Sequence, residues 1–176
     1  MPLQHDQGSV KLPPHCNLTV AKELWPLLND GTVDRIDASE VTDLGQAMRA
    51  ASAIKVMVVD DQASMRAMIR RSLQDFGFKD VRDKGDASEA LASVRDDRVH
   101  LIISDYNMPG MDGIEFLGEV RKDPVIGKTV FIMLTGSAEK DVVQKAAALG
   151  VNNYVVKPFT PAVLKEKIER VFGPLN

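Results

Sequence analysis

The sequence lacks the features that mark disulfide-bonded, membrane-spanning, secreted and nucleic-acid-binding proteins. Its single cysteine, Cys16, cannot form a disulfide within the chain. No apolar run approaches the about 18 residues of a membrane-spanning helix, and the first residues lack the basic and apolar regions of a signal peptide. The 22 Lys and Arg residues against 25 Asp and Glu leave no basic excess for nucleic-acid binding. We therefore expect a cytoplasmic protein that binds neither nucleic acid nor membrane.

The composition is that of an ordinary folded protein. Of the 176 residues, 44% are hydrophobic and 27% are charged. This length slightly exceeds one common domain, so one domain with an appendage is expected. The three His residues lie far apart in the sequence and have no metal-ligand spacing.

Four stretches rich in β-branched residues each lead directly to a polar side chain. In chain order they are Ile54–Asp61, Leu101–Asp105, Val130–Thr135 and Tyr154–Lys157. They end in an acid pair (Asp60 and Asp61), a single acid (Asp105), a hydroxyl and an amine. If the strands are parallel, these side chains meet at one edge of a sheet, where open α/β sheets bind their ligands.

The clustered carboxylates need a chemical reason, because each negative charge makes the next harder to ionise. A hard divalent cation and acid/base chemistry are both such reasons, and oxygen-only ligands suit Mg²⁺. Asp105 need not cap the following helix, since Asp112 lies in a better position for that task.

The remainder alternates between predicted strands and helices. The strands are Lys55–Val59, Val81–Lys84, Leu101–Ser104, Val130–Leu134 and Tyr154–Val156; the helices are Ser64–Phe76, Ala87–Asp96, Gly113–Lys122, Lys140–Leu149 and Pro161–Val171. Helices between consecutive strands predict an α/β fold with a doubly wound parallel sheet. Gly77, Gly150 and Gly173 fall where helices should end.

Residues 54–173 resemble a response-regulator receiver domain of the CheY-like chemotaxis class. The matching motifs agree in order and spacing: Asp60-Asp61-Gln-Ala-Ser-Met-Arg66, Ile103-Ser-Asp105-Tyr-Asn-Met-Pro-Gly-Met-Asp-Gly113, Leu134-Thr135-Gly136 and Tyr154-Val-Val-Lys157-Pro158-Phe159-Thr160. The resemblance implies a flavodoxin-like, five-stranded sheet with strand order 2-1-3-4-5.

The resemblance also implies roles for the residues around the acid cluster. Asp105 is the expected phosphoacceptor. Asp61 and Asp105 would bind Mg²⁺ directly, with the backbone carbonyl of Asn107 as a further ligand and Asp60 acting through water.

The remaining implied roles concern the last two strands. Lys157 would contact a phosphoryl oxygen, although a strand-end Lys can also lie in solvent, and Pro158 would follow a cis peptide bond. Thr135 would donate its hydroxyl to the phosphoryl group, but a Thr there can equally cap the next helix. Tyr154 would move inward as a switch, whereas an aromatic residue in a strand is usually part of the core.

Residues 1–53 resemble part of a STAS domain, through Leu12-Pro13, Leu18-Thr19, Asp37–Val41 and Leu44–Gln46. The phosphorylatable hydroxyl of that family is replaced by Thr42-Asp43 in a shortened loop. We therefore predict a small α/β appendage at 1–53 and a receiver domain at 54–176. With too few apolar residues for its own core, the appendage is expected to pack on the receiver or on another copy, which would give a homodimer.

These features predict a single-domain response regulator of a two-component chemotaxis phosphorelay. A chemotaxis histidine kinase would phosphorylate it, and the phosphorylated form would bind the flagellar motor switch. It would catalyse only its own phosphorylation and dephosphorylation. Two alternatives remain: a STAS-like adaptor gated by its receiver, and a phosphate sink that drains a kinase.

Overall fold

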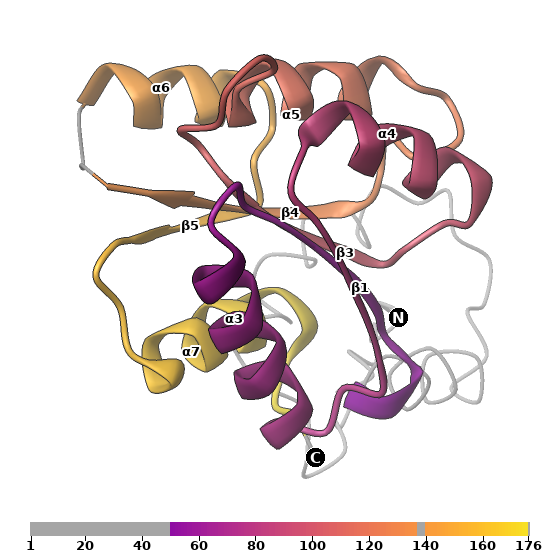
Figure 1. Cartoon of the computed structure of the whole chain (residues 1–176), viewed down its shortest axis with the longest axis vertical. Coiled ribbons are helices and arrows are strands. Elements are labelled where there is room, and N and C mark those ends of the chain that lie inside the picture. Colours follow the sequence, from indigo (N-terminus) through magenta and orange to yellow (C-terminus); the bar gives the residue numbers. More distant parts are fainter. Residues whose placement is uncertain (1–49, 137–139, 176) are drawn as a thin grey trace, which may run out of the picture. The chain divides into compact units, whose positions relative to one another are not determined.

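The computed structural model describes residues 50–136 and 140–175, and for residues 140 and 141 the backbone alone (Figure 1). Except for residues 50–53, the predicted appendage with its STAS-like motifs lies outside the described residues. Among the helices described, none has the combined length and apolar character needed to cross a membrane.

The strands form one parallel sheet. They are β1 (Lys55–Val59), β2 (Asp80–Lys84), β3 (Leu101–Asp105), β4 (Val130–Thr135) and β5 (Asn153–Val156). Their order is β2-β1-β3-β4-β5, and every neighbouring pair is parallel. The predicted doubly wound sheet and its order 2-1-3-4-5 are therefore confirmed.

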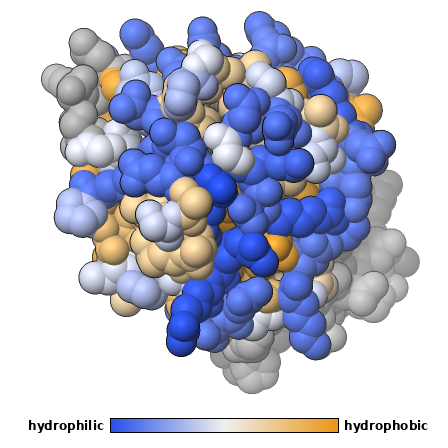
Figure 2. All heavy atoms as spheres, in the orientation of Figure 1, coloured by the Kyte–Doolittle hydropathy of each residue, from blue (hydrophilic) through white to orange (hydrophobic). Residues whose placement is uncertain are grey.

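The helices cover both faces of this sheet. They are the 3₁₀ turn η1 (Ala51–Ala53) and α3 (Ala63–Asp75), α4 (Ala87–Asp96), α5 (Gly113–Lys122), α6 (Lys140–Ala148) and α7 (Pro161–Phe172). Figure 1 shows α4, α5 and α6 on one face and α3 and α7 on the other. The face of the molecule seen in Figure 2 is mostly hydrophilic.

Alternating side chains of the central strands supply two hydrophobic cores, because successive residues of a strand point to opposite faces. Met57 and Ile102 belong to the core under α4, α5 and α6, where Phe116 and Phe131 meet edge to face with ring centroids 5.5 Å apart. The core under α3 and α7 contains the neighbouring strand residues, such as Ile103. Burial on both faces explains the almost continuous apolar runs of β1, β3 and β4.

The glycines predicted to end helices lie within two residues of the ends of α3, α6 and α7. Gly77, Gly150 and Gly173 have positive φ angles, as residues that terminate helices often do. Asp112 caps α5 in a capping box: its side chain accepts from the Glu115 N–H, and Glu115 accepts from the Asp112 N–H.

The start of the described chain joins the receiver core. Ala51 is fully buried and belongs to the core under α3 and α7. The Ile54 N–H donates to the Ala51 carbonyl at 3.2 Å. The predicted boundary between residues 53 and 54 stays a prediction, but at least Ala51 packs with the residues that follow it.

Candidate functional site

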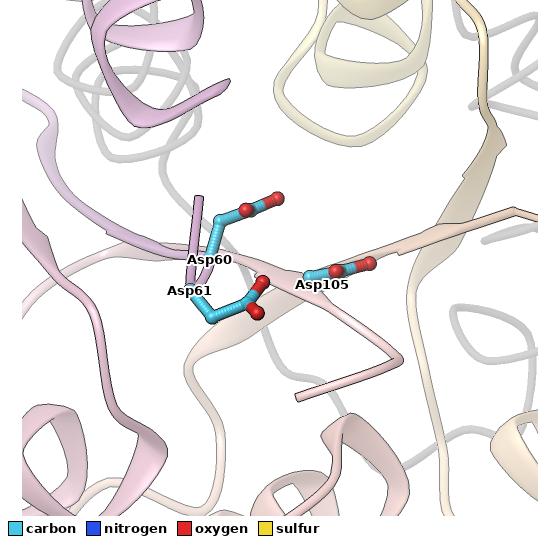
Figure 3. A group of neighbouring side chains, drawn as sticks. All are labelled: Asp60, Asp61 and Asp105. Carbon is cyan, nitrogen blue, oxygen red and sulfur yellow. The ribbon is translucent and has the colours of Figure 1, made fainter. Parts of the chain in front are cut away.

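The carboxylates predicted to cluster do so at one edge of the sheet. β1 and β3 are neighbours, and Val59 at the end of β1 pairs with Ser104 of β3. Asp60 and Asp61, which follow β1, therefore lie beside Asp105, the last residue of β3. One carboxylate oxygen from each of the three residues lies within 4.8 Å of the other two. Figure 3 shows the three side chains extending from the two strand ends into a shared space.

The three carboxylates differ in their access to water. Asp60 is completely buried and Asp105 is 4% exposed, whereas Asp61 is exposed. The cluster is therefore built on the buried strand ends and opens to solvent on the Asp61 side.

Lys157 brings a positive charge to the buried pair. It follows β5, and its Nζ lies 2.8 Å from Asp60 Oδ2 and 3.1 Å from Asp105 Oδ1. Burial works to lower the pKa of Lys157, but its hydrogen bonds and charge contacts with Asp60 and Asp105 outweigh this and raise the pKa. The alternative of a strand-end Lys in solvent is excluded. The peptide between Lys157 and Pro158 is cis, as predicted.

The acid at the end of β3 is held in an environment that disfavours its charge. Burial raises the pKa of Asp105, and the nearby Asp60 carboxylate adds to the rise. The Lys157 ammonium and a hydrogen bond from the Asn107 backbone oppose the rise without cancelling it. Asn107 itself is exposed and lies in the loop after β3.

The two predicted switch residues lie on the last two strands of the sheet. Thr135 ends β4 and is buried, and its carbonyl accepts from the Lys157 N–H at 2.7 Å. Tyr154 on β5 is 37% exposed, with Lys167 Nζ 5.5 Å from its ring centroid. The expectation for a typical strand aromatic, burial in the core, does not apply here.

The donors present suit a hard divalent cation. Asp60, Asp61 and Asp105 offer only oxygen atoms, the ligands that Mg²⁺ prefers, and the opening at Asp61 leaves room for the waters that Mg²⁺ usually retains. By donor chemistry and access, the residues fit this ion.

Two basic residues near the site, Lys84 and Arg66, bind different partners. Lys84, at the end of β2, forms an ion pair of 3.6 Å with Glu89 rather than with the acid cluster. Arg66 on α3 donates to the backbone carbonyls of Asp60 and Asp61. Its place in the first motif is visible in the sequence, but the contact with backbone atoms has no sequence signal.

Comparisons with known proteins agree with this geometry. The family model of the response regulator receiver domain matches residues 56–169. A probable chemotaxis protein CheY of Rhizobium etli is 44% identical over 129 residues, covering 73% of this chain and 100% of the relative. The chemotaxis protein CheY of Pseudomonas aeruginosa is 42% identical, covering 70% of this chain and 99% of that protein.

Solved structures give the same result. The chemotaxis protein CheY4 of Vibrio cholerae superposes with a TM-score of 0.64 at 40% identity, over 67% of this chain and 98% of that chain. A response regulator from Chloroflexus aurantiacus superposes with a TM-score of 0.64 at 26% identity, over 68% of this chain and 97% of that one.

Proposed function

Because this chain belongs to the response regulator receiver family and is a CheY-like receiver of two-component chemotaxis signalling, we propose that Asp105 accepts a phosphoryl group from a histidine kinase. The observation that carries this proposal is the position of Asp105. Its carboxylate ends the central strand β3, beside two further carboxylates and the Lys157 ammonium.

The proposed reaction is covalent catalysis by the protein on itself. An Asp105 oxygen attacks phosphorus and forms an acyl phosphate, while the bond between phosphorus and the donor atom breaks. The attacking carboxyl must be ionised, and burial works against this by raising the pKa of Asp105. Lys157 counteracts that effect and, once the phosphoryl group has arrived, is positioned to pair with one of its oxygens.

The acid cluster supplies the proposed Mg²⁺ site. Asp61 and Asp105 would bind the ion directly, together with the carbonyl of Asn107, and Asp60 would act through water. When bound, Mg²⁺ neutralises negative charge on the phosphoryl group and on the carboxylates. Asp60 in addition holds Lys157, through the 2.8 Å contact with its Nζ.

The proposed output is a change in partner binding. A phosphoryl group adds about −1.5 to −2 charges, and the Thr135 hydroxyl would donate to it. Thr135 and Tyr154 lie on adjacent strands, and the register pairs Thr135 with Val156. Movement of the Thr135 side chain would thus be sensed on β5, where Tyr154 would turn inward. The flagellar motor switch is the proposed target, consistent with the chemotaxis relatives.

Phosphorylation at Asp105 is tested by labelling with acetyl phosphate in Mg²⁺. Wild type should gain one hydroxylamine-sensitive phosphoryl group, and Asp105→Asn should gain none. Asp112→Asn is the matched control, because it removes a nearby carboxylate while Asn still caps the helix. A label that persists in Asp105→Asn or resists hydroxylamine would contradict the assignment.

The output is tested by a pull-down with and without a beryllofluoride mimic of the phosphoryl group. The motor-switch proposal predicts a switch protein captured only with beryllofluoride. Capture that depends on residues 1–53 would favour the adaptor alternative, based on the STAS-like resemblance. A kinase drained of phosphate with no beryllofluoride-dependent partner would favour the phosphate sink.

A further inference from the structure

Among the three carboxylates of the acid cluster, that of Asp61 is the least constrained by contacts with other residues. Asp60 and Asp105 are buried and bound by Lys157. Asp61 is exposed, and no hydrogen bond or ion pair to its carboxylate occurs within residues 50–136 and 140–175. The direction of this side chain therefore depends on the conformation of its own backbone.

One guanidinium nitrogen holds that backbone on both sides. Arg66 Nη1 donates to the carbonyl of Asp60 at 2.7 Å and to the carbonyl of Asp61 at 3.2 Å. The first carbonyl belongs to the peptide plane before the Asp61 Cα and the second to the plane after it. Because each peptide unit is planar, fixing both planes restricts the φ and ψ angles of Asp61.

The guanidinium is itself anchored from β2. Arg66 Nε lies 2.9 Å from Asp83 Oδ2, and the Arg66 side chain is 19% exposed. Gly85 leaves space for it, since a Cβ at that position would lie 3.3 Å from Nη1. The ion pair with Asp83 on β2 and the space left by Gly85 thus allow the Arg66 guanidinium of α3 to reach the carbonyls of Asp60 and Asp61.

We propose that Arg66 is a positioning residue for the metal site, which orients Asp61 by holding the two peptide planes that flank it. This inference rests on the proposed role of Asp61 as an Mg²⁺ ligand. It assigns to Arg66 no contact with the ion or with the phosphoryl group.

Arg70 offers a matched control. It lies one helical turn further along α3, and its Nη1 binds the other oxygen of the same Asp83 at 2.9 Å. It makes no hydrogen bond to the carbonyls of Asp60 or Asp61. Arg66→Ala and Arg70→Ala therefore remove the same charge and the same type of ion pair, but only the first removes the hydrogen bonds to the carbonyls of Asp60 and Asp61. The bond from the Gln62 N–H to Asp60 Oδ1, at 2.9 Å, remains in both variants.

The test uses the full chain and two measurements. In the metal-free protein, the carbonyl ¹³C resonances of residues 60 and 61 should shift in Arg66→Ala and stay in place in Arg70→Ala. In a calorimetric titration with Mg²⁺, Arg66→Ala should weaken binding by about tenfold or more, the usual loss when a group that orients a metal ligand is removed. Arg70→Ala should bind as wild type does. If Arg66→Ala does not fold, Arg66→Met takes its place, because Met keeps an unbranched apolar side chain and has no N–H to donate to the two carbonyls.

Equal Mg²⁺ affinities in wild type and Arg66→Ala, or equal losses in Arg66→Ala and Arg70→Ala, would overturn the positioning role and leave the proposed metal site intact. Asp61→Asn separates this failure from that of the site itself. If Asp61→Asn binds Mg²⁺ as wild type does, the metal role of Asp61 fails, and the inference about Arg66 fails with it.

Discussion

In the absence of a metal ion, the surroundings of Asp105 in the folded protein disfavour the charged form of its carboxyl group. Its raised pKa means that the folded state holds a proton more tightly than the unfolded chain does. Between the unfolded pKa of about 3.9 and the higher folded pKa, the free energy of unfolding therefore falls as pH rises. Above the folded pKa, the ionised carboxylate is a source of instability.

We expect Asp105→Asn to be more stable than wild type in EDTA at neutral pH, because Asn keeps the shape and removes the charge. Lys157 should keep its partner in this variant, because it also contacts Asp60 at 2.8 Å. The difference should shrink as pH falls towards the unfolded pKa of the carboxyl group, where wild type loses the same charge. Denaturant unfolding across this pH range measures it. A variant less stable at neutral pH, or a difference independent of pH, would contradict the argument.

Mg²⁺ should reverse this instability, because the folded cluster binds the ion and the unfolded chain does not. At 100 times its dissociation constant, the ion should add about 2.7 kcal/mol to the free energy of unfolding. Asp61→Ala should lose most of this gain, and Asp112→Asn should keep it. Thermal melts with and without Mg²⁺ compare the three proteins, and equal shifts in all of them would place the ion elsewhere.

For single residues, the sequence identifies the side chains that form the site, but not the contacts that side chains make with backbone atoms. Asp60, Asp61, Asp105 and Lys157 follow apolar strand stretches, so the parallel sheet alone predicts that they converge. Arg66 escapes this reasoning, since its partners are carbonyl groups that every residue carries.

At the scale of elements, α5 begins close to the backbone of the segment that carries the proposed acceptor. A Cβ on Gly113, its first residue, would lie 2.5 Å from the Asp105 carbonyl oxygen and 2.8 Å from the Tyr106 Cα. Both are backbone atoms of the segment that carries the carboxylate. The Gly113 N–H also donates to the Tyr106 carbonyl at 2.8 Å. The absence of a side chain here lets the helix begin directly beside the strand end.

Gly113→Ala should therefore destabilise the protein and slow labelling of Asp105, because backbone must move to admit the methyl group. Gly118→Ala is the control in the same helix. Its Cβ would meet only Leu149 Cδ1, at an ordinary 4.0 Å, so the better helix propensity of Ala should stabilise by up to about 1 kcal/mol. Chemical denaturation and acetyl phosphate labelling check both variants. Similar effects of the two substitutions would show that helix propensity, and not the close approach, decides.

The elements themselves were largely predictable, because strands and helices alternate and glycines mark the helix ends. The limits of α4 and α5 agree with the prediction, while β2, β3, β4 and β5 are each one residue longer. What holds α5 to the opposite end of the sheet was not predicted. Arg121 donates to the carbonyls of Gly127, Thr129 and Gly150, and burial lowers its pKa. An arginine that binds only uncharged oxygens has no sequence signature.

For the molecule as a whole, every residue assigned to phosphoryl transfer lies between Asp60 and Lys157, and the sheet that positions these residues is formed by strands between Lys55 and Val156. The segment before residue 50 lies outside the described residues, and its sequence contains apolar residues such as Leu24, Trp25 and Leu28. We propose that this segment tunes the receiver and does not enable its chemistry.

Two truncations separate the segment from the receiver core. A chain beginning at Ala50 should keep acetyl phosphate labelling of Asp105, because the sheet and the acid cluster are intact. A chain beginning at Ile54 should label as well but unfold more easily, by about 1 kcal/mol, since it loses the buried methyl group of Ala51. If residues 1–49 mediate a homodimer, the full protein should have the mass of two chains in solution, and both truncated proteins should have the mass of one. Denaturant unfolding, labelling and light scattering measure the three properties. If the chain beginning at Ala50 is insoluble or does not label, the segment is integral to the receiver, and the division into two parts is wrong.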